Sequence, residues 1–423
     1  MSDRSRRWCA SLAASLLLAS LPVGPAASAD TITIATHYTD AQLAPLTRCL
    51  REYEAAHPGS RIVHQQSDID DYLQGVLTAR LGGTSPDIYN IYTTWGAQLT
   101  DNGVLDTPPA SVQHFVENGY VPSTVDAIKV GGKVWGIPTE ISAYMLIYNK
   151  KQFAAAGIAA PPANWDEVVA DAAKLAKHNA AGRLTTAGYA FGPTAANGVH
   201  PFLALLASRG VSLFTPDLKG TNLASQAAID VLAGERRLFA QGSTDNAIQV
   251  RDFPSGAAAM IIYANWSKQM MQQAFGAATD DTVGVAPIPA GPDWRTLQYG
   301  FFWAVDANSP RKAAAWALLQ WLNAPHGASG RSCTGDFLVA LGGLTGNKAD
   351  IAASPEYRDA FSKPFVDAIA SGRAVAAPNV LHATEIQQVL RTAIGRAWSG
   401  EQTPAAALAD ADRQITGLLA ESP

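Results

Sequence analysis

The chain has 423 residues, which at roughly 100–200 residues per domain is enough for two or three domains. Hydrophobic residues make up 48% and charged residues 16%, so a large core can form and wholesale disorder is excluded. The 31 Lys and Arg are outnumbered by 36 Asp and Glu, giving a net charge of −5. We therefore expect no nucleic-acid partner, which would call for a basic surplus.

The first 29 residues have the layout of a secretory signal peptide. Arg4, Arg6 and Arg7 precede the uncharged apolar run Ala10–Leu21, which is too short to span a bilayer. Ala27–Ala29 supplies a small-residue cleavage site, so we expect a periplasmic protein cleaved after Ala29.

The three cysteines are too few for a disulfide scaffold. Cys49 and Cys333 remain after cleavage and could pair in an oxidising compartment, but the sequence leaves open whether they lie close together.

Strand-like and helix-like segments alternate along the chain, which predicts an α/β fold with a parallel, doubly wound sheet. Alternating or continuous apolar runs predict strands at Thr31–Thr36, Arg61–His64, Asp87–Ile91, Ala143–Tyr148, Ala257–Tyr263, Val283–Ile288 and Phe301–Val305. Apolar residues at helical spacing predict helices at Leu43–Ala56, Asp70–Leu81, Glu167–Lys177, Arg311–Leu322 and, with an interruption, Glu385–Leu419. No flexible linker separates these segments.

Motifs that carry catalysis are absent. The chain has no G-x-x-x-x-G-K-[ST], no G-x-S-x-G, no H-E-x-x-H and no C-x-x-C. The eight histidines are scattered without metal-ligand spacing. We therefore expect no catalytic residue, no metal and no cofactor.

Several ordered blocks resemble the family 1 extracellular solute-binding proteins of bacterial ABC importers, the maltose-binding-protein-like sugar-binding proteins. The blocks span most of the chain after the signal peptide, and their order and spacing are more specific than any one of them. They are Tyr72–Ile88, Gly132–Pro138 followed by Tyr148–Lys150, Phe253 with Gly256 and Ala259–Met260, and Val283–Gly291.

The resemblance implies a type II periplasmic-binding-protein fold with two doubly wound lobes, a hinge and a ligand cleft between them. It implies that the chain leaves lobe 1 near Trp135–Ile141 and returns near Pro287–Gly291. Lobe 1 would then comprise residues 30–138 plus 290–335, and lobe 2 residues 139–289 plus 336–423. The expected partners are the permease subunits of an ABC transporter, and we expect a monomer.

The resemblance places solute contacts on loops that follow strands and on the crossing segments. The residues of this chain at those places are His37, Tyr38, Tyr92, Thr94, Trp95, Glu140, Ser142, Asn197, His200, Asn265, Trp266, Gly300, Phe301 and Phe302. Trp266 matches a position where the family often stacks an aromatic ring on a sugar. An indole can cover the apolar face of a pyranose, while Asn, Thr, Glu and His can hydrogen-bond its hydroxyls.

These loops carry almost no Lys or Arg, which favours a neutral sugar or polyol over a phosphate or carboxylate solute. Glu140 and nearby Asp40 are acidic, so a cationic solute such as a polyamine remains an alternative. A secreted carbohydrate-active hydrolase is the alternative from another class. It would need two carboxylates facing each other about 5–10 Å apart, and the sequence offers no such pair.

Overall fold

The computed structural model describes residues 30–421. The expected signal peptide and its cleavage site lie outside the described residues. Between Asp30 and Glu421, no helix is both long and apolar enough to cross a bilayer.

The strands are β1 (Asp30–Thr36), β2 (Ser60–Gln66), β3 (Ile88–Tyr92), β4 (Lys129–Val130), β5 (Lys133–Val134), β6 (Ile137–Asn149), β7 (Lys177–His178), β8 (Leu184–Thr186), β9 (Met260–Ala264), β10 (Val283–Ala286), β11 (Thr296–Val305), β12 (Leu344–Thr345) and β13 (Ala374–Ala376). In the first half of the chain the helices are α1 (Ala44–Ala56), α2 (Ile69–Gly82), α3 (Gly96–Asp101), α4 (Ala110–Gly119), α5 (Pro122–Asp126), α6 (Lys150–Ala155), α7 (Trp165–Leu175) and α8 (His200–Ser208). In the second half they are α9 (Gln226–Ala240), α10 (Lys268–Phe275), α11 (Thr279–Thr282), α12 (Lys312–Asn323), α13 (Cys333–Leu341), α14 (Lys348–Ala353), α15 (Ser362–Ala370), α16 (Ala383–Ser399) and α17 (Pro404–Ala420).

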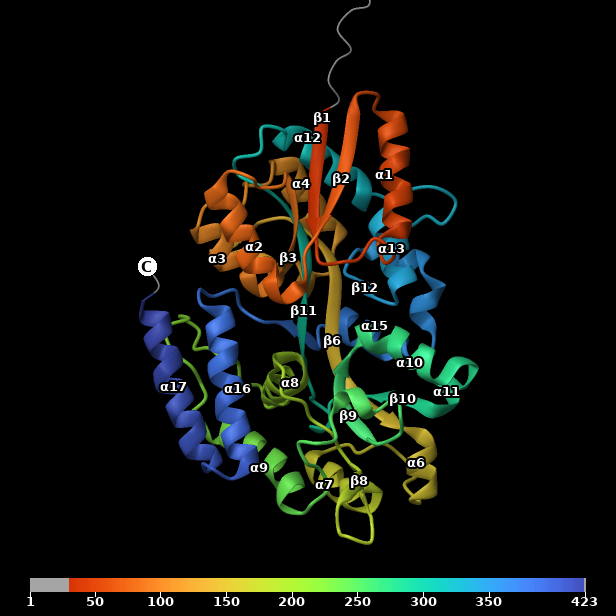
Figure 1. The fold of residues 1–423 in the computed structure, drawn as a ribbon, viewed down its shortest axis with the longest axis vertical. Coiled ribbons are helices and arrows are strands. Elements are labelled where there is room, and N and C mark those ends of the chain that lie inside the picture. Colours follow the sequence, from red (N-terminus) through yellow and green to blue (C-terminus); the bar gives the residue numbers. More distant parts are fainter. Residues whose placement is uncertain (1–29, 422–423) are drawn as a thin grey trace, which may run out of the picture.

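Two long antiparallel strands, β6 and β11, run along the molecule and join its two ends (Figure 1). Towards one end, β11 pairs with β3, which lies beside the parallel pair β1 and β2. Towards the other end, β6 pairs with β9 and β10, and β11 pairs with β13. The predicted alternation of strands and helices is therefore present, with β6 and β11 shared by both ends. The prediction of a parallel sheet is wrong, because β6 pairs antiparallel with β9, β10 and β11, and β11 antiparallel with β3.

Separate hydrophobic cores define two lobes. The core of the first lobe contains Ile32, Leu46, Ile137 and Trp303, whereas Tyr299 belongs to a core of the second lobe. A further core of the second lobe includes Ile141, Ala143 and Ile261. The chain therefore passes between lobes within β6, between Ile137 and Ile141, and again within β11, between Tyr299 and Phe302.

The second passage lies further along the chain than the Pro287–Gly291 segment expected from the sequence. Residues 283–286 pair with β6 inside the second lobe as β10. The backbone N–H of Gly291 then donates to the carbonyl of Ala163, which holds the following turn in the same lobe. Two prolines and a glycine in that segment favour a turn over a crossing strand.

Cys49 and Cys333 form a disulfide with their Cα atoms 6.0 Å apart. The bond joins α1 to α13, which pack against each other in the first lobe. Both residues are buried in that lobe's core. The sequence left open whether Cys49 and Cys333 lie close together, and the structure shows that they do.

Removing this disulfide in a Cys49→Ala/Cys333→Ala variant is expected to lower the free energy of unfolding by about 2 kcal/mol. The bond closes a loop across a sequence separation of 284 residues and so restricts the unfolded chain. Urea denaturation of the variant, and of the wild type with and without reductant, measures the change. An unfolding midpoint that does not move on reduction would contradict the expectation.

Candidate functional site

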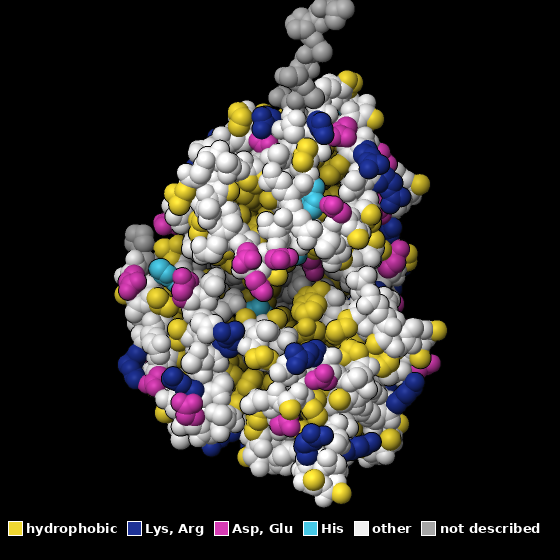
Figure 2. Space-filling model, in the orientation of Figure 1, with side chains coloured by type: hydrophobic (Ala, Val, Ile, Leu, Met, Phe, Trp, Pro, Cys, Tyr) yellow, Lys and Arg dark blue, Asp and Glu magenta, His cyan; other side chains and the backbone are white. Residues whose placement is uncertain are grey.

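The surface is hollowed where the two lobes meet (Figure 2). The loop after β1 and the end of β3 come from the first lobe, while β6 and β11 pass through this level. The carboxyl ends of β1 and β3, which are parallel, meet at one edge of the sheet, so residues that follow them lie near each other. Most of the residues predicted to bind a solute lie around this junction.

Tyr38 and Glu140 form a buried pair at the junction. The hydroxyl of Tyr38 donates to Oε2 of Glu140 at 2.6 Å, and only 6% of Glu140 is exposed. Burial raises the pKa of Glu140, and the hydrogen bond from Tyr38 partly opposes that effect. The pKa of Tyr38 is likewise raised by burial and by the neighbouring carboxyl. The pair holds the loop after β1 against strand β6.

A continuous row of aromatic rings crosses the junction. The His37 ring stacks on Phe301 with centroids 4.4 Å apart, and Phe301 lies 5.1 Å from Tyr92. Tyr92 stacks at 6.0 Å on Tyr299, which stacks at 4.0 Å on His200. The row joins the first lobe to the second, and its rings can cover the apolar face of a small guest.

The two histidines of the row are uncharged at neutral pH. Burial lowers the pKa of His37 to about 4. Burial also lowers the pKa of His200 to about 3, with a smaller opposing contribution from Gln387. His200 shares a 2.8 Å hydrogen bond between its Nδ1 and the Tyr144 hydroxyl. The row therefore adds no positive charge to the junction.

Two buried polar atoms have no hydrogen bond within residues 30–421. They are Nδ1 of His37, in the row, and Oδ1 of Asn197, in the turn before α8. A buried polar atom left without a partner costs about 1–3 kcal/mol, so such atoms are suited to bind the hydroxyls of a guest.

Thr94 and Ser142 are buried beside the row. Thr94 lies in the short turn η1 (Thr93–Trp95) after β3, and Ser142 lies on β6 opposite Tyr299. Trp95 packs against its own lobe, because its ring stacks on Tyr72 at 5.9 Å and meets Tyr92 edge-on. Asn197 lies in the single π-helical turn η2 (Ala195–Val199) that precedes α8.

The neighbours Asn265 and Trp266 have different roles. Asn265 is 1% exposed, and its side chain accepts from the Ala143 N–H and donates to the Ile141 carbonyl. Those bonds fasten the turn after β9 to β6 and leave the amide little capacity for a solute. Trp266 is 37% exposed and touches Tyr263 edge-on at 4.4 Å, so its indole is available at the surface.

Two of the predicted residues on β11 do not present a side chain to the row. Phe302 is buried in the core of the first lobe, because it points to the opposite side of the strand from Phe301. Gly300 has no side chain and lies where the pairing of β6 with β11 changes register. We therefore leave Phe302 out of the candidate site and assign Gly300 a backbone role.

Tyr144 and Tyr299 contribute to the row but were missing from the sequence expectation. Tyr299 stands two residues before Phe301 on the same strand, so the strand period of two could have placed both rings on one face. Tyr144 lies on β6 and reaches His200, a partner distant in the sequence. Within the described part of the chain, no group of His, Cys, Asp and Glu is arranged to hold a metal ion.

Comparisons with known proteins agree with this architecture. A binding protein from Brucella abortus is 27% identical over 433 residues, covering 98% of this chain and 99% of the relative. A probable amino-acid ABC transporter periplasmic-binding protein of Sinorhizobium fredii is 23% identical over an alignment that covers 83% of this chain and 80% of the relative. The solved structure of the sugar-binding protein MalE from Xanthomonas citri superposes with a TM-score of 0.78 at 19% identity, covering 92% of this chain and 98% of its own.

The MalE superposition shows a type II periplasmic-binding-protein fold with two lobes, as the sequence predicted. The family of bacterial extracellular solute-binding proteins matches residues 39–328, which is more than half of the chain. The family and the fold are those of binding proteins rather than of enzymes. The chain belongs to the bacterial extracellular solute-binding proteins, which serve ABC transporters.

Proposed function

We propose that the protein binds a small neutral sugar or polyol between its lobes and delivers it to the permease of an ABC importer. The observation that carries the proposal is the aromatic row from His37 to His200, which offers ring faces and the unpartnered Nδ1 of His37. None of the fourteen residues predicted from the sequence is Lys or Arg, so nothing among them favours an anionic solute. The sugar-binding neighbour from Xanthomonas citri supports the same solute class.

The proposal includes two discontinuous lobes. Relative to the division expected from the sequence, residues 290–299 belong to lobe 2 and α13 to lobe 1, because Tyr299 packs in the second-lobe core and Phe337 in the first-lobe core. It also includes export to the periplasm with cleavage after Ala29. N-terminal sequencing of protein recovered from the periplasm tests the cleavage. Recovery of a chain that still begins with Met1 would contradict it.

The Trp266→Ala variant is expected to bind its sugar or polyol about thirtyfold more weakly or worse. An exposed indole that stacks on a solute behaves as a binding hot spot, and truncating it removes about 2 kcal/mol or more. The measurement is a thermal-shift screen of neutral sugars and polyols at millimolar concentration, followed by calorimetric titration of those that bind.

Trp321→Ala is the matched control, because Trp321 packs against Tyr53 in the first lobe, away from the row. It should lower stability and leave affinity unchanged. Equal affinity of the Trp266→Ala variant and the wild type would remove the indole from the site. If no neutral sugar or polyol raises the melting temperature of the wild type, the proposed solute class is wrong.

A cationic solute is the competing proposal. Glu140 lies at the junction, and acidic side chains (magenta) gather along the first-lobe edge of the hollow in Figure 2. Tyr38 already occupies one oxygen of Glu140, and burial raises the pKa of this carboxyl, so it is poorly suited to pair with a cation. Polyamines and amino acids in the same thermal-shift screen separate the two proposals. A hydrolase would need a second carboxyl, and Glu140 is alone among the candidate residues.

A further inference from the structure

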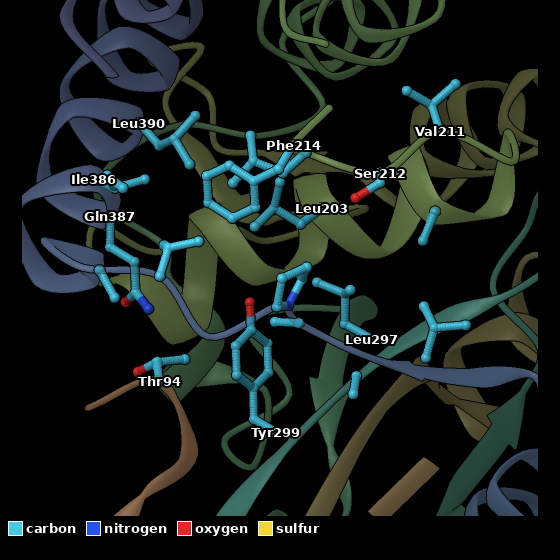
Figure 3. Close-up of a pocket in the computed structure, with 18 of the residues that line it drawn as sticks. Thr94, Leu203, Val211, Ser212, Phe214, Leu297, Tyr299, Ile386, Gln387 and Leu390 are labelled. Carbon is cyan, nitrogen blue, oxygen red and sulfur yellow. The ribbon is translucent and has the colours of Figure 1, made fainter. Parts of the chain in front are cut away.

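A cavity of about 380 Å³ lies in the second lobe, beside the aromatic row. Figure 3 shows it between α8, α16, strand β11 and the segment that follows β13. Its volume falls within the range of about 300–1,000 Å³ that is usual for small-molecule sites.

The walls of this cavity are mostly apolar. Leu203, Phe214, Leu297, Ile386 and Leu390 turn their side chains into it (Figure 3). A much smaller engineered cavity of about 150 Å³ with Leu, Ile and Phe walls stays dry and binds benzene. The cavity in this protein is therefore suited to an alkyl chain or an aromatic ring.

One end of the cavity is polar and adjoins the proposed solute site. Thr94 and Gln387 line this end, and the Tyr299 hydroxyl points into the cavity (Figure 3). The ring of Tyr299 is at the same time a member of the aromatic row, stacked between Tyr92 and His200. A guest lying on the row could thus extend past Tyr299 into the apolar space.

The electrostatics of the cavity exclude an ionic occupant. Among the residues that line it, Arg295 alone carries a charge, and this residue is exposed to solvent. A charged group in the apolar part would lose its hydration without gaining a partner. The apolar walls with a polar end match a neutral molecule that is hydroxylated at one end and apolar at the other.

We propose that this cavity receives the apolar part of a neutral amphiphilic solute, such as the aglycone of an alkyl or aryl glycoside, while its hydroxyls bind at the aromatic row. This inference rests on the proposed function and adds a substituent to its solute class. The apolar walls supply affinity in proportion to the area of the guest that they cover.

The first experiment tests the cavity without assuming any sugar. The neutral apolar fluorophore N-phenyl-1-naphthylamine is titrated into wild-type protein, where we expect one bound molecule per chain. Ser212→Trp and Ala207→Phe place bulk in the cavity and should each weaken binding at least tenfold. Ser371→Trp, at an exposed position outside the cavity, should bind as the wild type does. Melting curves confirm that each variant is folded. Because either filled variant could fail to fold, the test uses two, and the result from the folded one is sufficient.

The second experiment links the cavity to the solute. Hexyl and methyl glycosides of glucose, galactose and mannose are compared by calorimetric titration. Each buried methylene should raise affinity about fourfold, so hexyl glycosides should bind at least about a hundredfold more tightly than methyl glycosides. Ser212→Trp should abolish that difference while leaving the methyl glycoside unaffected.

The outcomes separate the two proposals. Absence of fluorophore binding to the wild type, or equal binding to both filled variants, overturns the cavity as a binding site. Equal affinity for hexyl and methyl glycosides overturns its role in solute binding. Fluorophore binding with no response to any sugar or polyol supports the cavity and overturns the proposed sugar function.

Discussion

The Gly300→Ala variant is expected to lose about 3 kcal/mol or more of folding free energy. A Cβ atom at this position would lie 2.3 Å from the Glu140 carbonyl oxygen and 3.3 Å from the Ile141 Cα. Both are backbone atoms of β6, so no side-chain rotation can relieve the contact. Strands β6 and β11 are paired on either side of Gly300 and cannot separate there without breaking ladder hydrogen bonds.

Gly75→Ala is the matched control. Gly75 lies inside α2, where a Cβ would meet nothing within 4 Å. Alanine is the better helix former, so this variant should gain about 0.5–1 kcal/mol. Urea denaturation of both variants measures the difference. A Gly300→Ala variant as stable as the wild type would mean that the two strands are not held this closely at the passage between lobes.

Gly300 also links the fold to the site. Strand β11 alternates regularly through Gly300, while β6 carries an extra residue opposite Phe301, because Gly300 pairs with Ile141 and Phe302 with Pro138. Phe301 joins the row and Phe302 joins the core. The effect of Gly300→Ala should therefore extend to solute binding in any molecules that still fold.

Local sequence patterns predicted most of the elements. The period of the apolar residues placed α1, α2, α12, β1 and β3 to within a few residues of their bounds. The patterns missed the first half of β6, because Gly136 and Pro138 read as a turn. Pro138 is accommodated in the strand, where it pairs with Phe302.

The candidate site was harder to predict because its contacts join distant parts of the chain. Residues 38 and 140 could each be proposed from the sequence, yet their hydrogen bond spans 102 positions and depends on the order of the sheet, in which β11 and β3 separate β6 from β1. The backbone role of Asn265 likewise depends on β6 lying next to β9. Sequence patterns report on local conformation, whereas these contacts are consequences of tertiary packing.

Glu235 is expected to make the protein's stability fall as the pH rises from about 5 to 8. This residue of α9 is fully buried, and burial raises its pKa from 4.5 to about 8. One carboxyl oxygen accepts from the Trp398 indole N–H at 2.9 Å, while Oε1 has no hydrogen bond within the described residues. The folded state keeps the proton through this range, because an ionised carboxylate would lose its hydration.

The sign follows from proton linkage. Below about pH 4.5 the carboxyl is protonated in both states, and its contribution to stability is complete. As the pH rises from 4.5 to about 8, the unfolded chain releases the proton and the folded chain does not. Stability then falls by up to about 1.4 kcal/mol per pH unit, or about 4 kcal/mol between pH 5 and 8.

Glu235→Gln replaces the carboxyl by an amide of similar shape, which does not titrate. Its stability relative to the wild type should therefore increase steadily from pH 5 to 8, as measured by urea denaturation at each pH. The buried histidines His37 and His200 are common to both proteins, so their contribution cancels in the difference. Glu117→Gln, at an exposed position on α4, should show a constant difference. The expectation is contradicted if the stability of Glu235→Gln relative to the wild type also stays constant with pH. Glu235 would then be ionised in the folded protein, with its charge compensated by another group.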